Sequence, residues 1–280
     1  MRLVAVGKPN PIRKSAQLEH ELMFWERSGN QWNQLGPTKF AGRRFSPTVA
    51  EFSDDGNRLL AFDPLAARSQ RQVIVLELNT DGKKKHYKWK YSTGGSLNHS
   101  VFADPQGSVV LSSVVNAKNT HQVIAWSFEP RPRVIAKSKD IDSEITQIDF
   151  WDNAVLGVTK DKKSLYWTAD DTEFSGLSLA PRIFRGHRNA IHRANIVQPG
   201  AEFVSISVDN PEVLKTNVRK FIKDQIDMSP NIKRADDGSV ANTFFENEAN
   251  DQIIVGNDHG FVAIHDIKAP ESPPTHGCLL

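Results

Sequence analysis

The chain has 280 residues, of which 39% are hydrophobic and 24% are charged, so it can bury the core of an ordinary globular protein. Its 35 lysines and arginines nearly balance 33 aspartates and glutamates, so net charge argues neither for nucleic acid nor for a membrane surface. A single cysteine excludes an internal disulfide, and no stretch approaches the roughly 20 apolar residues of a membrane helix, so we expect a cytoplasmic protein without a membrane partner.

Short strands separated by turns recur along the chain. The turn residues are spaced 51, 46, 47 and 51 residues apart, at Gly56, Gly107, Asn153, Gly200 and Asp251. This period is close to one four-stranded propeller blade, about 40–45 residues without insertions. Alternating apolar and polar segments precede the turns and more continuous apolar segments follow them, which is typical of sheets covered on one or both faces. The pattern predicts an all-β fold.

The two ends of the chain do not supply whole blades. Near the start, segments 3–6, 22–25 and 31–35 read as the second, third and fourth strands of a blade that lacks its innermost strand. About six blades are represented in one domain, 1–268, followed by a proline-containing tail, 269–280. The expected blades are roughly 1–36, 40–93, 96–138, 144–186, 190–238 and 240–268. The alternatives are a part of a seven-bladed or larger propeller, or a ring that another chain completes, and open edges would then favour self-association.

One segment departs from the strand pattern. From Pro211 to about Asp227, apolar residues fall at helical spacing, at Leu214, Val218, Phe221, Ile222 and Ile226. Proline suits the first turn of a helix, and Ser229-Pro230 would end it. We expect a short helical insertion in the fifth blade, with a strand over 212–218 as the alternative.

Two segments carry a resemblance to a known repeat. Residues 186–191 begin with Gly-His, and 199–209 continue with a turn glycine, a second strand and an aspartate. Residues 257–266 and the pair Asp161 and Trp167 match the later part of the same unit. These segments resemble the WD40 repeat, a family of β-propellers, with divergent repeats.

The resemblance implies a structural role for several polar residues. In the family, a buried His, Ser or Thr, Asp and Trp form a hydrogen-bonded set that holds the strands of a blade together, since a buried polar group is tolerated only when it is paired. The residues placed in this set are His187, Ser205, Asp209, Asp161, Trp167, Asp258 and His265. No blade keeps the full set, so apolar packing is expected to provide most of the stability.

Enzymatic signatures do not appear in the sequence. There is no Gly-rich phosphate loop, nucleophile elbow or HExxH helix. The nine histidines do not predict a metal site, because His187 and His192 would point to opposite faces of a strand and zinc needs three or four convergent ligands. We expect a protein that is not an enzyme and that has no cofactor and no metal.

The expected function is a scaffold or recognition module that binds a protein partner, and the family resemblance allows a part of a larger multidomain protein. Loops on a stiff frame usually carry recognition. The loops before each first strand would place six residues on the binding face: Arg44, Phe45, Asn98, Glu144, Arg188 and His192. The alternative is a nucleic-acid-binding propeller that uses basic clusters at 83–91, 182–193 and 215–223.

Overall fold

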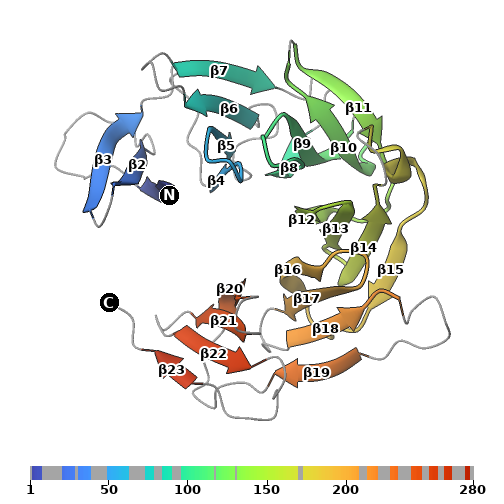
Figure 1. The fold of residues 1–280 in the computed structure, drawn as a ribbon. Coiled ribbons are helices and arrows are strands. Elements are labelled where there is room, and N and C mark those ends of the chain that lie inside the picture. The colour runs from blue at the N-terminus through green and yellow to red at the C-terminus, as the bar shows by residue number, and fades with distance from the viewer. Residues whose placement is uncertain are drawn as a thin grey trace, which may run out of the picture. The chain divides into compact units, whose positions relative to one another are not determined.

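The computed structural model is all-β, and its strands form antiparallel sheets of three or four strands (Figure 1). The prediction of an all-β chain is therefore confirmed. The structure describes residues 2–7, 21–28, 31–38, 49–62, 73–78, 84–89, 96–116, 118–129, 131–169, 173–207, 213–219, 228–232, 241–247, 252–257, 262–266 and 275–277. In this part of the chain, no helix is long and apolar enough to cross a membrane.

The chain divides into two compact units, and the first comprises residues 1–148 and 173–178. Its first sheet has three strands, β1 (Arg2–Gly7), β2 (Glu21–Ser28) and β3 (Gln31–Thr38). Its second sheet has four, β4 (Val49–Phe52), β5 (Arg58–Phe62), β6 (Val73–Leu78) and β7 (Lys84–Trp89). The third consists of β8 (Ser96–Phe102), β9 (Val109–Val115), β10 (His121–Ser127) and β11 (Arg133–Lys137). Strands that follow one another in sequence are neighbours in each sheet.

The second unit comprises residues 149–172 and 179–280. One of its sheets is built from β12 (Ile145–Trp151, which begins in the first unit), β13 (Ala154–Thr159), β14 (Lys163–Thr168) and β15 (Arg182–Arg185). The next contains β16 (Ile191–Gln198), β17 (Glu202–Ser207), β18 (Val213–Asn217) and β19 (Met228–Ile232). The last contains β20 (Ala241–Asn247), β21 (Gln252–Asn257), β22 (Val262–Asp266) and β23 (Thr275–Gly277). The same strand order recurs, so one four-stranded unit is repeated along the chain.

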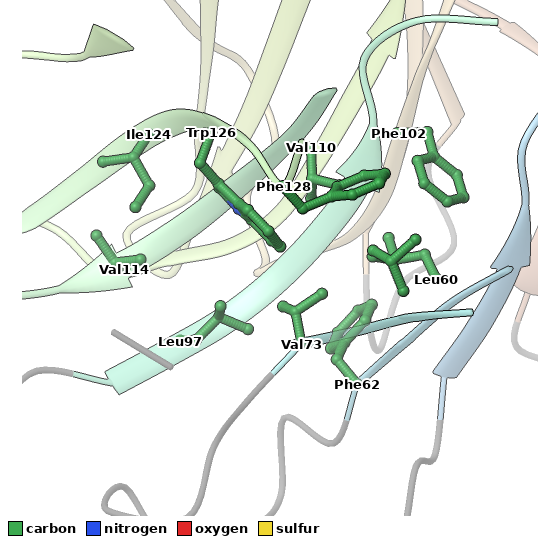
Figure 2. Packing of buried hydrophobic residues seen from close by; sticks show 11 residues of the cluster. Leu60, Phe62, Val73, Leu97, Phe102, Val110, Val114, Ile124, Trp126 and Phe128 are labelled. Atoms are coloured by element: carbon green, nitrogen blue, oxygen red, sulfur yellow. The ribbon is translucent and has the colours of Figure 1, made fainter. Parts of the chain in front are cut away.

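A core cluster in the first unit lies between the sheet β4–β7 and the sheet β8–β11. Figure 2 shows Phe62 and Val73 of one sheet pointing toward Leu97 and Trp126 of the other. The Trp126 side chain is 1% exposed and Phe128 is fully buried, with their rings edge to face at 6.3 Å. Strand alternation produces this arrangement, because every second side chain of a strand faces the same neighbour.

Arg58 joins the same two sheets at their edge. Its Nη2 contacts Glu129 Oε1 at 2.5 Å, and its guanidinium lies 5.0 Å from the centre of the Phe128 ring. Its Nη1 donates to the Gln106 carbonyl at 3.3 Å. One side chain thereby combines an ion pair, a cation–π contact and a backbone hydrogen bond between two sheets.

A second core cluster lies in the second unit. Phe184 of β15 and Phe203 of β17 meet edge to face at 5.3 Å, and Leu156 of β13 and Val218 are fully buried beside them. Apolar side chains from neighbouring sheets therefore fill the space between those sheets, as the apolar runs in the sequence predicted.

The helix expected over 211–227 is wrong where the structure describes it, because Val213–Asn217 form strand β18 between β17 and β19. The burial pattern explains the difference: Leu214 and Thr216 are each 3% exposed, whereas Lys215 between them reaches Glu202 at 2.5 Å. This alternation has the period of a strand, and pairing with β17 satisfies the backbone. The strand that the sequence left as the alternative is therefore the correct reading, and 220–227 lie outside the described residues.

Candidate functional site

Polar side chains in the second strands of two sheets make buried hydrogen bonds to a neighbouring strand or loop. In β9, Ser112 Oγ accepts a hydrogen bond from Trp126 Nε1 at 2.9 Å and lies 2.7 Å from Ser100 Oγ. In β17, Ser205 Oγ lies 2.6 Å from His187 Nε2. All five side chains are buried, with at most 7% exposure. Each buried serine therefore joins a different strand or loop to its own second strand.

The strand registers show that Ser112 and Ser205 occupy equivalent positions. Trp126 is paired with Val110, two residues before Ser112, and Thr216 is paired with Phe203, two residues before Ser205. We call this serine position the hub. The sheet β8–β11 thus has a hub with a Trp and no His, and the sheet β16–β19 has a hub with a His and Thr216 in place of the Trp.

The sheet β12–β15 lacks the hydroxyl at the hub. Trp167 is paired with Val155, so its hub position is Gly157, which has no side chain to accept a hydrogen bond. Accordingly, the Trp167 indole N–H is buried and has no hydrogen-bond partner in the described part of the chain. Asp161 accepts instead from the Thr159 hydroxyl at 2.6 Å and forms an ion pair with Lys163.

Burial of His187 changes its proton affinity. Desolvation lowers the pKa of His187 from 6.5 to about 4, so its ring is neutral at physiological pH. A neutral ring can share one proton with the serine hydroxyl without a charge being buried. The remaining residues expected in the set, Asp209 and Asp258, lie outside the described residues, as does the side chain of His265.

A carboxylate on a first strand links two sheets of the second unit. The Asp149 carboxylate on β12 accepts from the Ile196 backbone N–H on β16 at 2.7 Å. Desolvation raises the pKa of Asp149 to about 6, and the hydrogen bonds from Ile196 and Phe150 and the charge of Arg193 only partly oppose this rise. In the first unit, His99 Nδ1 accepts similarly from the Ile148 N–H at 3.3 Å. First strands are thus connected by side chain to backbone hydrogen bonds.

The residues expected on a binding face have different environments. Asn98 lies in β8 and is 7% exposed, and Glu144 is partly buried just before β12. Arg188 and His192 are exposed at the start of β16, where the Arg188 carbonyl accepts from Lys162 Nζ at 2.5 Å. Arg188 and His192 belong to the second unit, and Asn98 and Glu144 to the first. Arg44 and Phe45 lie outside the described residues.

Several charges of the basic clusters are engaged within the protein. Lys215 forms an ion pair with Glu202. Arg193 donates a hydrogen bond to Asn195 Oδ1 at 3.1 Å, and its charge acts to lower the pKa of Asp149. Arg182, Arg185, Arg188 and Arg219 remain partly or fully exposed. In the cluster 83–91 the structure describes only the backbone of β7, not its side chains. No group of three metal-ligating side chains is found among the described residues.

Sequence reasoning missed Ser112 and Asp149. Ser112 and Ser113 interrupt the apolar run 109–115, and that interruption is a signal that could have drawn attention to Ser112. Asp149 carries no comparable signal, because its burial depends on β16. No protein-family model matches the chain, and no curated protein matches it, so the geometry stands without a family assignment.

Proposed function

We propose that the chain is a β-propeller of divergent WD40-type repeats that binds a protein partner. The observation that supports this proposal best is the recurring hub. The contacts of Ser112 with Trp126 and of Ser205 with His187 are the two halves of the hydrogen-bonded set that the family resemblance implies. They occur at equivalent register positions in two separate sheets.

The repeated strand order supports the same architecture. A propeller blade is a four-stranded antiparallel sheet with its strands in chain order, and five sheets of the chain have this form. Apolar clusters between neighbouring sheets within each unit match the way that blades cover one another.

Two features of the chain support binding of a protein rather than catalysis. Buried Ser112 and Ser205 are hydrogen-bonded to Trp126 and His187 in two of the sheets, which suits a rigid frame. Exposed loops and turns between strands then remain for recognition. Nucleic-acid binding is the weaker candidate, because Lys215 and Arg193 of the expected basic clusters are engaged with Glu202, Asn195 and Asp149.

The architecture is tested by an experimental density map of the purified chain. The proposal expects consecutive sheets to be related by successive rotations about one axis. Two stacked sandwiches, with no common axis, would overturn it.

The partner class is tested by filter binding of labelled RNA and DNA at low and high salt, beside cross-linking of the protein in cell extract. Phosphate contacts weaken steeply with salt, by roughly one unit of log–log slope for each neutralised phosphate. We expect no nucleic-acid retention at low salt, together with cross-links to a protein that survive at high salt. Salt-sensitive retention without protein cross-links would favour the nucleic-acid alternative.

A further inference from the structure

We propose that Arg182 and Arg219 form a binding site for an acidic peptide segment of the partner protein, and this inference rests on the proposed function. The two arginines come from different sheets of the second unit. Tyr166 and Gly200 connect them, and these four residues are called the arginine site below.

A chain of contacts connects the two arginines. Arg182 on β15 is directly paired with Tyr166 on β14. The Tyr166 hydroxyl accepts from the Gly200 backbone N–H at 2.8 Å, and Arg219 Nε donates to the Gly200 carbonyl at 3.1 Å. Tyr166 and the Gly200 turn therefore link Arg182 to Arg219, and the charges of both arginines act on the Tyr166 hydroxyl.

The electrostatic environment of the Tyr166 hydroxyl is positive. Desolvation raises its pKa, and the charges of both Arg182 and Arg219 act to lower it, with no carboxylate among the causes. Within the described residues, neither arginine forms an ion pair with an acidic side chain. The arginine site therefore has two cationic groups whose charge no described carboxylate neutralises.

The Arg219 side chain is held in place before any ligand arrives. The Val218 N–H donates to the Ala201 carbonyl at 2.6 Å, and the Arg219 N–H donates to Asn217 Oδ1 at 3.0 Å. Nε donates to the Gly200 carbonyl, and the two terminal nitrogens, which carry the other four N–H donors of the guanidinium, make no hydrogen bond to another described residue. Groups that are positioned in advance lose less conformational entropy on binding.

The arginine site also has room for a ligand. Gly200 is exposed, and a Cβ built on it meets no atom within 4 Å. Arg219 is exposed and Arg182 is partly exposed. A planar carboxylate can receive two parallel hydrogen bonds from a guanidinium, and two guanidiniums can bind two such groups.

An acidic peptide fits this surface better than a nucleic acid does. A polynucleotide needs an extended basic track, whereas here Lys215 in the adjacent strand is engaged by Glu202. Leu179, three residues before Arg182, is 65% exposed, and an apolar contact beside charged ones is typical of a protein interface. Charge complementarity together with this apolar neighbour identifies the occupant as an acidic segment of a protein.

The test is fluorescence anisotropy with a labelled peptide of glutamate and glycine, and a matched peptide of glutamine and glycine as the neutral probe. The wild-type chain is expected to bind the glutamate peptide and not the glutamine peptide. The double variant R182Q/R219Q is expected to bind the glutamate peptide at least about tenfold more weakly. The double variant R131Q/R133Q is the matched control, because it removes the same charge from two exposed arginines in the other unit, and its affinity should be unchanged.

A second variant, R182K/R219K, separates a shaped site from general positive charge. Lysine keeps the charge but not the planar fork, so we expect an affinity between those of the wild type and R182Q/R219Q. Equal losses in R182Q/R219Q and R131Q/R133Q would overturn the proposal, and so would wild-type affinity in the lysine variant. Tighter binding of an oligonucleotide of equal charge, lost in R182Q/R219Q, would assign the site to nucleic acid instead.

Thermal unfolding of each variant shows whether a loss of binding is a loss of folding. Both arginines are at least partly exposed, so the variants should unfold at the wild-type temperature. Absence of peptide binding in a protein whose sheets share one axis would remove the arginine site and leave the proposed function intact. Sheets without a common axis would remove the proposed function, whatever the peptide result.

Discussion

At the scale of single residues, stability depends on which buried polar groups have partners. Ser112 and Ser205 each satisfy a neighbouring ring nitrogen, whereas Trp167 has no such partner in the described chain. A buried donor without a hydrogen-bond partner lowers the free energy of unfolding by about 1–3 kcal/mol, and a hydrogen bond to that donor removes this cost. Substitutions that break one of these hydrogen bonds should therefore lower stability, whereas substitutions that remove an unpaired polar group should not.

The first prediction concerns the hub serine of the sheet β16–β19. Ser205→Ala removes the partner of His187 inside the core, so we expect the free energy of unfolding to fall by about 1–3 kcal/mol in urea denaturation. Ser113→Ala is the matched control, because the buried Ser113 hydroxyl has no hydrogen-bond partner among the described residues, and we expect this variant to be as stable as the wild type or more stable. Equal losses in both variants would contradict the role of the hub.

The second prediction compares two tryptophans at equivalent positions. Trp126→Phe breaks the hydrogen bond to Ser112, whereas Trp167→Phe removes an indole N–H that is already unsatisfied. Both variants lose a similar apolar area, so the difference isolates the hydrogen bond. We expect Trp126→Phe to be less stable than Trp167→Phe by about 1–3 kcal/mol in denaturant titrations. The reverse order would show that packing, not the hydroxyl, governs these sites.

The third prediction concerns pH, because Asp149 and His187 act in opposite directions. With its pKa raised to about 6, Asp149 keeps a proton that the unfolded chain releases near 3.8, so its contribution to stability falls as pH rises between about 4 and 6. With its pKa lowered to about 4, His187 lacks a proton that the unfolded chain takes up near 6.5, so its contribution falls as pH falls through this window.

Single variants separate the two contributions. Asp149→Asn should make the free energy of unfolding rise more steeply with pH than in the wild type between about pH 4 and 6.5. His187→Gln should make it rise less steeply or decline. Denaturant titrations across this pH range measure both slopes, and parallel curves for all three proteins would refute the assignment.

At the scale of elements, two turn glycines have the same backbone conformation in different surroundings. Gly107 and Gly200 have φ of 66° and 68°, a region that other residues adopt with strain. A Cβ on Gly107 would lie 2.8 Å from Ser53 Cβ and 3.0 Å from the Phe102 ring, whereas one on Gly200 meets nothing within 4 Å. The first turn is therefore packed against its neighbours, and the second is open.

The fourth prediction follows from this difference. Gly200→Ala should destabilise by about 1–2 kcal/mol, which is the cost of the left-handed conformation alone. Gly107→Ala should cost that amount and about 1–3 kcal/mol more, because Ser53 and Phe102 must shift. Melting temperatures and denaturant titrations of the two variants measure the difference, and equal stabilities would mean that the Gly107 turn moves freely.

The sequence predicted the type of secondary-structure element wherever the alternation of apolar and polar residues agreed with the turn residues. The apolar run 154–158 is a strand and the segment at Gly200 is a turn, as their sequence patterns predicted. The helix prediction failed over 213–217 because a helical and a strand pattern were both present, and only pairing with β17 decided between them. The spacing of apolar residues within a segment does not show which strand that segment pairs with.

Most of the site could not be predicted, because it depends on register and on contacts between sheets. The bond between Ser112 and Trp126 requires β9 and β10 to pair with Val110 opposite Trp126. The arginine site requires a turn in one sheet to meet a tyrosine in another. Residue spacing along the chain carries no information on either contact.

At the scale of the whole molecule, the first sheet has three strands and β1 is paired on one side only, with β2, among the described strands. An unpaired strand edge can bind another strand. The other two sheets of the first unit and the three described sheets of the second have four strands each, so a fourth strand for the first sheet would complete the repeat.

The fifth prediction follows from this open edge. We expect the chain to self-associate as its concentration rises, measured by sedimentation velocity, and Ala5→Pro to reduce the association, because proline removes a backbone donor from β1. Val262→Pro in the last sheet is the control for a general effect of proline on folding. A chain that stays monomeric at the highest attainable concentration would show that the edge is closed by other residues of the same chain.

The short 3-10 turn η2 (Ser175–Ser178) belongs to the first unit, contacts β11 and buries Leu177 completely, although 149–172 before it and 179–280 after it belong to the second unit. The first unit is therefore not a continuous stretch of polypeptide. A recombinant fragment that stops at residue 148 would lack Leu177 and cut β12, leaving the apolar surface beneath η2 in water. A fragment that stops at residue 178 would keep Leu177 but would lose β15 from the sheet β12–β15, so neither position is a suitable place to divide the chain for expression.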